Sequence, residues 1–380
     1  MRDDKPLDPA TIAARAAGAV DGEHGGVVPG VQPATTFRRD ESYALMSGGS
    51  YGRDHNATVL QAEEVLRQLE GAAETRLFPS GMAAVAALFR TLPDGARVVM
   101  QSGIYWGVTA WVREFCARRN IRLEEVDAAD PLAIRKALVD KADLVWIEVP
   151  SNPWLRVSDI GAIAKLTHDR GGLLAVDGTA ATPVLTRVLE LGADISMHSG
   201  TKAINGHSDV LAGVLSCRDA GTETWRAICA DRQAAGAILG PFEAWLLMRG
   251  MRTLPLRMER MCRSAQVLAE ELAAHECVER VLYPGLPDHP SHGLAAAQMK
   301  GGFGYLMSVL VKGGAEEALA VAGRMRLIHR ATSLGGVESL VEHRATIEPH
   351  TGIPGNLLRL SVGIEDAGDL MADLDQALRG

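Results

Sequence analysis

Apolar runs of strand length alternate with helical segments through much of the chain, and this alternation limits the possible folds more than any other feature. The runs 97-RVVMQ-101 and 173-LLAVDG-178 are apolar on both faces of a strand. Segments with apolar residues at helical spacing, such as 57–71 and 158–171, separate such runs. Strands that are buried on both faces and joined by helices predict a mostly parallel sheet covered by helices, the α/β class.

Changes in composition divide the chain into three predicted parts. Residues 1–50 are rich in Gly, Pro and Ala and predict an N-terminal arm with one short helix, for which Asp8 is the expected N-cap. Residues 51–235 carry the strand and helix alternation and predict the α/β domain. Residues 236–380 begin with a long helical region and continue with short strands among helices, so we expect a smaller α+β domain there.

Charge and cysteine content exclude several classes of protein. The chain of 380 residues has a net charge of −8 with both signs interspersed, so neither nucleic acid nor an anionic membrane is expected as a partner. The longest apolar runs have strand length and the N-terminus is charged, so we expect no membrane-spanning segment and no signal peptide. The five cysteines form no C-x-x-C pair, which favours unpaired thiols and a cytoplasmic location.

One lysine stands out in 194-DISMHSGTKAINGHSD-209. Lys202 follows a predicted strand and is preceded by Ser199, Gly200 and Thr201. Most lysines in such places lie in surface loops, but the carboxyl ends of strands are also where α/β folds bind ligands. The two hydroxyls suit a phosphate group, and a lysine beside a phosphate site is the arrangement that holds pyridoxal phosphate (PLP) as a Schiff base.

Two other segments supply what PLP requires. Ser80, Gly81 and Met82 open a predicted helix, whose N-terminal N–H groups suit a phosphate, although the same residues could serve only as a helix cap. Asp177 ends a buried strand 25 positions before Lys202. A carboxylate there is costly without a partner, and it could hold the pyridine nitrogen of PLP in its protonated form.

Several motifs in one order resemble the Cys/Met-metabolism family of PLP enzymes. This family includes cystathionine γ-synthase, cystathionine β-lyase, cystathionine γ-lyase and methionine γ-lyase. The resemblance implies the PLP-dependent transferase fold type I, like aspartate aminotransferase, and PLP as the cofactor. The motifs that carry it are 51-YGRDHNATVLQAEEVLRQLEG-71, 79-PSGMAA-84, 148-EVPSNP-153, 174-LAVDGTAATP-183, 196-SMHSGTKAINGHSD-209, 333-SLGGVESL-340 and 357-LLRLSVGIED-366.

The resemblance also implies a role for each matching residue. Lys202 would be the Schiff-base lysine and proton shuttle, Tyr105 would stack on the ring and act as acid or base, and Asp177 would hold the ring nitrogen. Thr179 and Asn152 would contact the ring, and Arg359 would bind the substrate α-carboxylate with Asn152 and Ser333 beside it. The residues expected around the phosphate are Gly81, Met82, Ser199 and Thr201 from one subunit, with Tyr51 and Arg53 from its neighbour. The family pattern therefore implies a homo-oligomer, a tetramer built as a dimer of dimers, with active sites shared across the dimer.

Departures from the family pattern leave the substrate open. Thr332 stands where γ-acting members often carry Glu and β-lyases an aromatic residue, and Arg344 stands where Pro is usual. The expected activity is β- or γ-elimination or replacement on a sulfur amino acid, of the cystathionine β-lyase or cystathionine γ-synthase type, without a metal. The alternatives are a γ-lyase acting on methionine, cystathionine or a non-sulfur substrate such as canavanine, and a PLP-binding protein without turnover. An NAD enzyme is disfavoured because no strand–GxGxxG–helix unit occurs.

Overall fold

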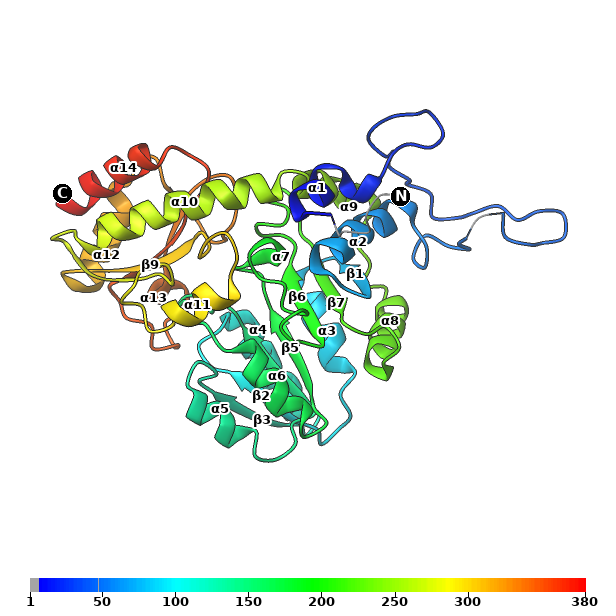
Figure 1. Ribbon diagram of the computed structural model, residues 1–380, viewed down its shortest axis with the longest axis horizontal. Coiled ribbons are helices and arrows are strands. Elements are labelled where there is room, and N and C mark those ends of the chain that lie inside the picture. The colour runs from blue at the N-terminus through cyan, green and yellow to red at the C-terminus, as the bar shows by residue number, and fades with distance from the viewer. Residues whose placement is uncertain (1–6, 47) are drawn as a thin grey trace. The chain divides into compact units, whose positions relative to one another are not determined.

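The computed structural model describes residues 7–46 and 48–380, which form two compact units of two chain segments each. Unit 1 comprises the described residues within Met1–Leu92 and those of Asp194–Pro255, and unit 2 comprises Pro93–Ala193 and Leu256–Gly380. Figure 1 labels the elements of both units. The domain boundaries expected near residues 50 and 235 stay a prediction.

The described part of unit 1 contains five α-helices, one 3₁₀ helix and three strands. In chain order these elements are α1 (Pro9–Ala14), η1 (Ala16–Gly18), α2 (Ala57–Glu70), β1 (Glu74–Phe78), α3 (Gly81–Arg90), β6 (Ile195–Ser199), β7 (Gly213–Cys217), α8 (Glu223–Ala235) and α9 (Pro241–Met251).

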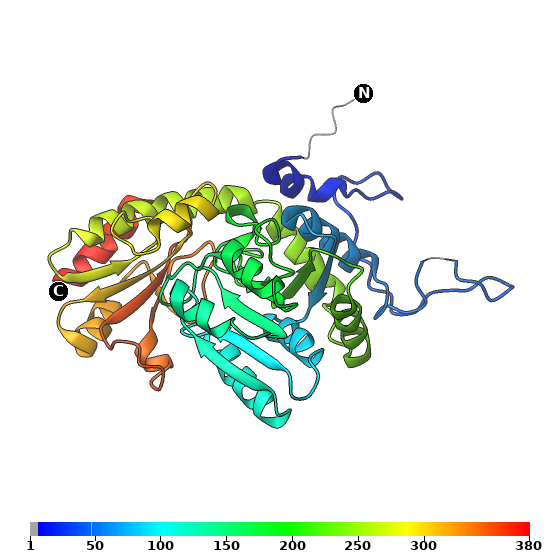
Figure 2. The same cartoon turned by 60° about the horizontal axis from the view of Figure 1, so that its bottom comes forward.

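The helices of unit 1 begin and end at the residues that the capping rules favour. Asp8 accepts a hydrogen bond from Ala10 N at 2.8 Å, which confirms it as the N-cap of α1. Asn56 caps α2 in the same way, and Gly71 ends α2 in the left-handed conformation with a φ of 66°. Between η1 and α2 the arm runs as the extended blue loops of Figures 1 and 2.

The three strands of unit 1 lie in the order β1-β7-β6 and pair antiparallel. Although the fold class predicted from the sequence is a mostly parallel sheet, β7 is antiparallel to both of its neighbours. Only the turns and loop of residues 200–212 join β6 to β7, and a parallel pair would need a longer crossover, usually a helix. A hydrogen bond of 2.7 Å between the buried hydroxyls of Thr75 and Ser216 links β1 to β7.

Unit 2 contains the remaining elements. They are β2 (Arg97–Gln101), α4 (Trp106–Arg118), β3 (Arg122–Val126), α5 (Pro131–Ala137), β4 (Leu144–Glu148), α6 (Ile160–His168), β5 (Leu173–Asp177), α7 (Thr182–Leu185), α10 (Leu254–Ala273, which starts at the end of unit 1), β8 (Val278–Leu282), α11 (His292–Gln298), β9 (Leu306–Val311), α12 (Gly314–Arg324), β10 (His329–Arg330), β11 (Leu340–His343), α13 (Arg344–Ile347), β12 (Leu357–Ser361) and α14 (Ala367–Arg379).

The strands in the first half of unit 2 are parallel and lie in the order β5-β4-β2-β3. Every residue of β2 and of β4 is buried, as expected for strands covered on both faces. The register pairs Glu148, the last residue of β4, with Asp177, the last residue of β5. Two carboxylates therefore end neighbouring strands at one edge of this sheet.

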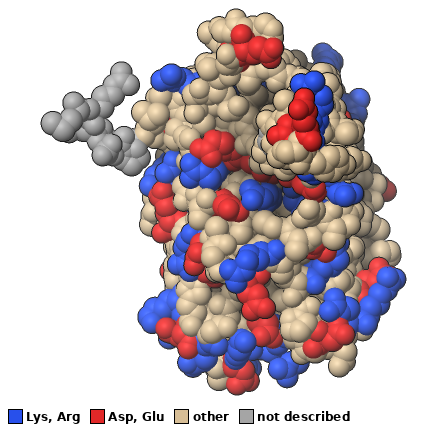
Figure 3. Space-filling view, turned by 90° about the vertical axis from the view of Figure 1, so that its right-hand side faces the viewer, with Lys and Arg blue, Asp and Glu red and all other residues tan. Residues whose placement is uncertain are grey.

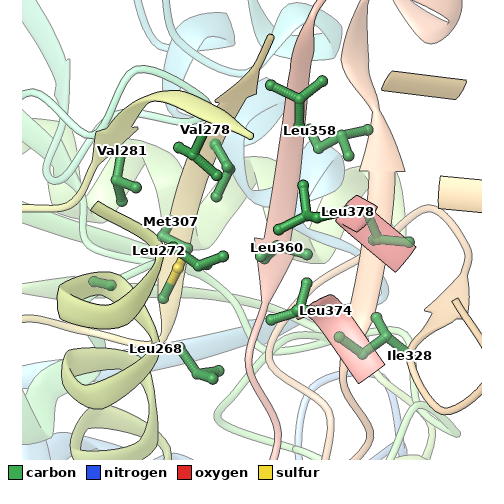
Figure 4. Close-up of a cluster of buried hydrophobic side chains, with 14 of the residues drawn as sticks. Leu268, Leu272, Val278, Val281, Met307, Ile328, Leu358, Leu360, Leu374 and Leu378 are labelled. Carbon is green, nitrogen blue, oxygen red and sulfur yellow. The ribbon is translucent and has the colours of Figure 1, made fainter. Parts of the chain in front are cut away.

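The second half of unit 2 is built on a sheet in the order β10-β11-β12-β9-β8, with α10, α12 and α14 packed against it. Figure 4 shows the core between the strands and these helices, where Leu272, Met307, Leu360 and Leu374 meet. β12 is the central strand of this sheet, and all its residues are buried, Arg359 among them.

The surface carries both signs of charge. Figure 3 shows Lys and Arg side chains interspersed with Asp and Glu over one face. Within residues 7–46 and 48–380, no helix combines the length and the apolar character that a membrane span needs. Each of the five cysteines lies in the described part and is a free thiol.

Candidate active site

Lys202 lies in a tight turn directly after β6 in unit 1. Its backbone N–H donates to Ser199 O at 3.1 Å, and its carbonyl accepts from Gly206 N at 2.8 Å. The hydroxyl of Thr201 accepts from Ala212 N at 2.9 Å and donates to Ala212 O at 3.2 Å. The half-buried lysine is therefore held just after the carboxyl end of a strand by a hydrogen-bonded turn.

The N-terminus of α3 closely approaches the end of β6. A Cβ atom added to Gly81 would lie 3.1 Å from Ser199 Cβ and 3.2 Å from Ser199 Oγ, so glycine is the residue that this approach allows. At Gly213 on β7 an added Cβ would lie 2.0 Å from Ser80 O, which no side chain tolerates. The structure thus brings together two residues predicted at the phosphate, Gly81 and Ser199, and places Met82 next to them on α3.

This part of unit 1 suits a phosphate group. The first N–H groups of a helix have no partner within the helix, and at α3 the Ser80 side chain accepts from Ala83 N at 3.1 Å. Those of Gly81 and Met82 lie ahead of the first intrahelical bond and can donate to an anion. The hydroxyl of Ser199 lies beside them, as the Gly81 geometry shows. Thr201 uses its hydroxyl on the Ala212 backbone instead and so positions the turn.

Tyr51 and Arg53 lie at the end of the arm in unit 1. The Arg53 guanidinium lies 5.3 Å from the centre of the Tyr51 ring, and Tyr51 is 44% exposed. Arg53 also approaches Asp54, at 3.8 Å. Both residues predicted to bind the phosphate are exposed.

Asp177 and Thr179 form a hydrogen-bonded pair at the end of β5 in unit 2. Asp177 Oδ1 accepts from both Thr179 N at 2.9 Å and Thr179 Oγ1 at 2.5 Å, and the Asp177 side chain is buried. Two bonds to one carboxylate oxygen fix the orientation of the group. The direct contact of Thr179 in the structure is thus with Asp177.

Glu148 is a buried acid that the sequence reasoning left without a role. Its carboxylate accepts from Tyr105 N at 3.0 Å and from Asn152 N at 2.6 Å. Burial, with the neighbouring charge of Asp177, raises the pKa of Glu148 to about 8. Glu148 therefore holds the backbones of Tyr105 and Asn152 at the end of β4, beside Asp177. The family resemblance implies that these two residues contact the cofactor ring. The signal that could have found Glu148 is an acid closing a fully apolar strand.

Tyr105 is the N-cap residue of α4 and is 38% exposed. A Cβ atom at Gly107 would lie 2.7 Å from the Tyr105 ring. Glycine at this position therefore allows the ring to pack against the first turn of α4. The backbone bond to Glu148 fixes the position of the tyrosine, while its ring remains accessible.

Arg359 is buried on β12 with 2% of its surface exposed. It donates to Asn152 Oδ1 at 3.3 Å and to Ser333 O at 2.6 Å, and it forms an ion pair with Glu342 at 2.8 Å. Within the described residues its Nε has no hydrogen-bond acceptor. Burial lowers the pKa of Arg359 to about 10, against the opposing effect of Glu342, so the guanidinium stays charged at neutral pH.

These contacts bring three predicted substrate-binding residues together. Arg359, Asn152 and Ser333 are joined by hydrogen bonds, and Ser333 contributes its backbone carbonyl at a φ of 129°, a conformation that non-glycine residues rarely adopt. A buried, charged guanidinium with an unused donor is suited to bind a carboxylate. Glu342, which lies opposite Arg359 on the neighbouring strand β11, forms an ion pair with this guanidinium.

Comparisons with known proteins cover almost the whole chain. Residues 10–379 match the family model described as Cys/Met metabolism PLP-dependent enzyme. The cystathionine gamma-synthase of Mycobacterium tuberculosis is 42% identical over 377 residues, which cover 97% of this chain and 96% of that protein. The cystathionine gamma-lyase of Dictyostelium discoideum is 37% identical over 370 residues, or 95% of each chain.

A solved structure gives the same result for the fold. The crystal structure of cystathionine gamma synthase from Xanthomonas oryzae pv. oryzae in complex with cystathionine matches with a TM-score of 0.94 and 36% identity, over 99% of this chain and 98% of that one. This likeness confirms the predicted fold class, a mostly parallel sheet flanked by helices with a smaller α+β part.

Proposed function

Because this chain belongs to the Cys/Met metabolism family of PLP-dependent enzymes, we propose that it catalyses γ-replacement on a homoserine-derived amino acid, the cystathionine γ-synthase type of reaction. PLP is its cofactor, and it is an enzyme of the transsulfuration type. In the proposed reaction the sulfur of a thiol such as cysteine forms a bond with substrate Cγ. The bond from Cγ to an acyloxy group breaks, and a carboxylic acid leaves.

Each unit by itself contains residues that suit a part of PLP. Gly81, Met82 and Ser199 would bind its phosphate, Lys202 would hold its aldehyde carbon, and Asp177, oriented by Thr179, would keep its pyridine nitrogen protonated. When bound, PLP supplies a ring that takes up the electron pair left at substrate Cα after proton removal.

The other steps require proton movements by side chains of this chain. We assign to Lys202 Nζ the removal of the Cα proton and the movement of a Cβ proton, which γ-chemistry requires. Tyr105, whose ring is accessible and whose backbone Glu148 holds, would serve as acid or base at the group that leaves Cγ.

The single observation that carries this proposal is the buried guanidinium of Arg359. Arg359 lies between Leu358 and Leu360 on a fully buried strand, where a charge is costly. A carboxylate bound at the unused Nε and the adjacent Nη would accept two charge-assisted hydrogen bonds. This predicts a substrate with a free α-carboxylate, as an amino acid has.

The exposed arm supports a homo-oligomer in which Tyr51 and Arg53 act on the neighbouring subunit. The arm exposes Val27, Tyr43 and Met46, large apolar residues that a monomer would leave in water. A second copy of this chain would cover them and would receive the two phosphate-binding side chains.

A product assay tests the proposed reaction. Purified enzyme with PLP is incubated with an O-acylhomoserine and cysteine, with cystathionine alone, with methionine and with canavanine, and the products are identified by mass spectrometry. We expect cystathionine and the free carboxylic acid from the first mixture. The Lys202→Ala variant is the control and should form neither.

Other products would identify other reactions. Pyruvate and homocysteine from cystathionine would indicate β-elimination, and 2-oxobutyrate would indicate γ-elimination. Formation of either as the main product, without cystathionine synthesis, would contradict γ-replacement. Cofactor absorbance without any product would indicate a protein that binds PLP without turnover, which would also contradict γ-replacement.

A further inference from the structure

Four buried charged side chains, on β11, on β12 and at the two ends of α13, form a continuous ion chain. Its members are Arg359, Glu342, Arg344 and Glu348, each at most 6% exposed. Arg359 Nη2 lies 2.8 Å from Glu342 Oε2, Arg344 Nη1 pairs with the same Oε2 atom, and Arg344 Nη2 pairs with Glu348 Oε1. The ion chain therefore starts at the proposed carboxylate-binding arginine and extends away from it.

The fold fixes this arrangement. The antiparallel register of β11 and β12 sets Glu342 opposite Arg359. The short helix α13 begins at Arg344, and Glu348 N donates to Arg344 O at 2.9 Å, so the one-turn spacing brings the two side chains together. Thr332, which precedes Ser333, also hydrogen-bonds to Glu342. The backbone hydrogen bonds of β11, β12 and α13 thus fix the positions of the four residues of the ion chain.

The balance of charge in the ion chain bears on anion binding. An ion pair of Arg359 with Glu342 alone would be neutral, and Glu342 would compete with an incoming carboxylate for the guanidinium. Because Arg344 binds the same oxygen of Glu342, it shares that negative charge and reduces its hold on Arg359. Glu348 in turn balances Arg344, so the ion chain contains two charges of each sign.

We infer that Arg344 is a positioning residue for substrate recognition, which holds Glu342 so that Arg359 stays oriented and available to an α-carboxylate. This inference rests on the proposed function, in which Arg359 binds the carboxylate. The side chain of Arg344 pairs with Glu342 and Glu348. It acts through Glu342, and the group it serves is the carboxylate of an amino-acid ligand.

The test uses two probes that differ only in the carboxylate. L-alanine and L-alaninamide are titrated into the PLP-loaded enzyme, and binding is followed by the change in cofactor absorbance. In Arg344→Gln the Kd of L-alanine should rise roughly tenfold, while that of L-alaninamide stays unchanged. Arg344→Lys, which keeps the charge, should restore most of the affinity.

Two further variants keep the test decisive. Arg344→Gln leaves Glu348 unpaired, so the double variant Arg344→Gln/Glu348→Gln, which removes one charge of each sign, serves if the single variant fails to fold. It should show the same selective loss. Arg324→Gln is the matched control, because it breaks the ion pair of 2.6 Å with Glu317 in the same unit and outside the ion chain. It should bind both probes as the wild type does.

The possible failures are distinguishable. If Arg359→Leu weakens L-alanine selectively but neither Arg344 variant does, the inference about Arg344 is wrong and the role of Arg359 stands. Equal weakening of both probes in the Arg344 variants would indicate a purely structural role and would also overturn the inference. If Arg359→Leu has no selective effect, the carboxylate role itself is wrong, and the inference falls with it.

Discussion

Glu148→Gln should change how the stability of the protein depends on pH. Burial beside Asp177 raises the pKa of Glu148 from 4.5 to about 8, so the folded protein keeps a proton that the unfolded chain loses. A raised pKa contributes stability that is fully present below the unfolded value and is lost as pH rises toward the folded value. Between these two pH values the wild type should therefore become less stable as pH increases. The glutamine variant should lack this dependence of stability on pH, because its side chain does not titrate.

The size of the effect follows from one proton. Each pH unit changes the free energy of unfolding by about 1.4 kcal/mol while the folded state holds one more proton than the unfolded state. From about pH 5.5 to 7.5 the wild type should lose roughly 2.7 kcal/mol more than Glu148→Gln. For 380 residues the entropy of unfolding is about 0.8 kcal/mol per kelvin, so the difference in Tm change is about 3 °C.

Thermal denaturation of cofactor-free protein at both pH values measures this difference. Glutamine can accept only one of the two backbone bonds from Tyr105 and Asn152, which costs about 1 kcal/mol at every pH, so the change between the two pH values is the informative quantity. Glu190→Gln, which alters a half-exposed carboxylate, is the control. Equal pH dependence in the wild type and in Glu148→Gln would refute the reasoning.

Three further predictions concern the ligand contacts. Arg359→Leu should raise KM for the amino-acid substrate about a hundredfold or more because its buried donors are lost, while the cofactor spectrum is kept; an unchanged KM would exclude the carboxylate contact. Gly81→Ala should lower PLP affinity, measured by equilibrium dialysis, about tenfold because the added Cβ crowds Ser199. Gly323→Ala is the control, because its Cβ would lie in open space, and it should leave this affinity unaltered. If Arg53 acts in the neighbouring subunit, mixing equal amounts of Lys202→Ala and Arg53→Ala subunits should restore about a quarter of wild-type activity. Half of the dimers would then contain both variants, and each of these would have one intact site of two. A mixture as inactive as its components would place Arg53 in its own subunit's site.

Local sequence patterns predicted most elements of the fold. The helix at 57–70 carries a clear apolar stripe, an Asn N-cap and a Gly after its end, and the structure agrees within one residue. The strand Glu74–Phe78 was missed because Glu74, Thr75 and Arg76 hide its pattern, and its pairing with β7 is not visible locally. The stretch 183-PVLTRVLELG-192 has apolar residues at helical spacing, but α7 ends at Leu185. The apolar residues beyond it are buried in turns.

Residue type and position in the sequence were enough to propose the lysine, the glycine and the aspartate of the candidate site. Lys202, Gly81 and Asp177 each stand at the end of a strand or the start of a helix, where local sequence indicates a ligand. The buried acids could not be interpreted in the same way. The environment of Glu148 depends on the register that sets it beside Asp177, and that of Glu342 on its pairing with Arg359, and both pairings join segments distant in sequence.

The central claim is that Lys202 binds the cofactor covalently, and chemical trapping tests it most directly. The PLP-loaded protein is reduced with borohydride, digested and analysed by mass spectrometry. We predict that the peptide containing Lys202 gains the mass of the reduced cofactor, and that Lys202→Ala shows no such peptide. The cofactor mass on another lysine, or on none, would contradict the account.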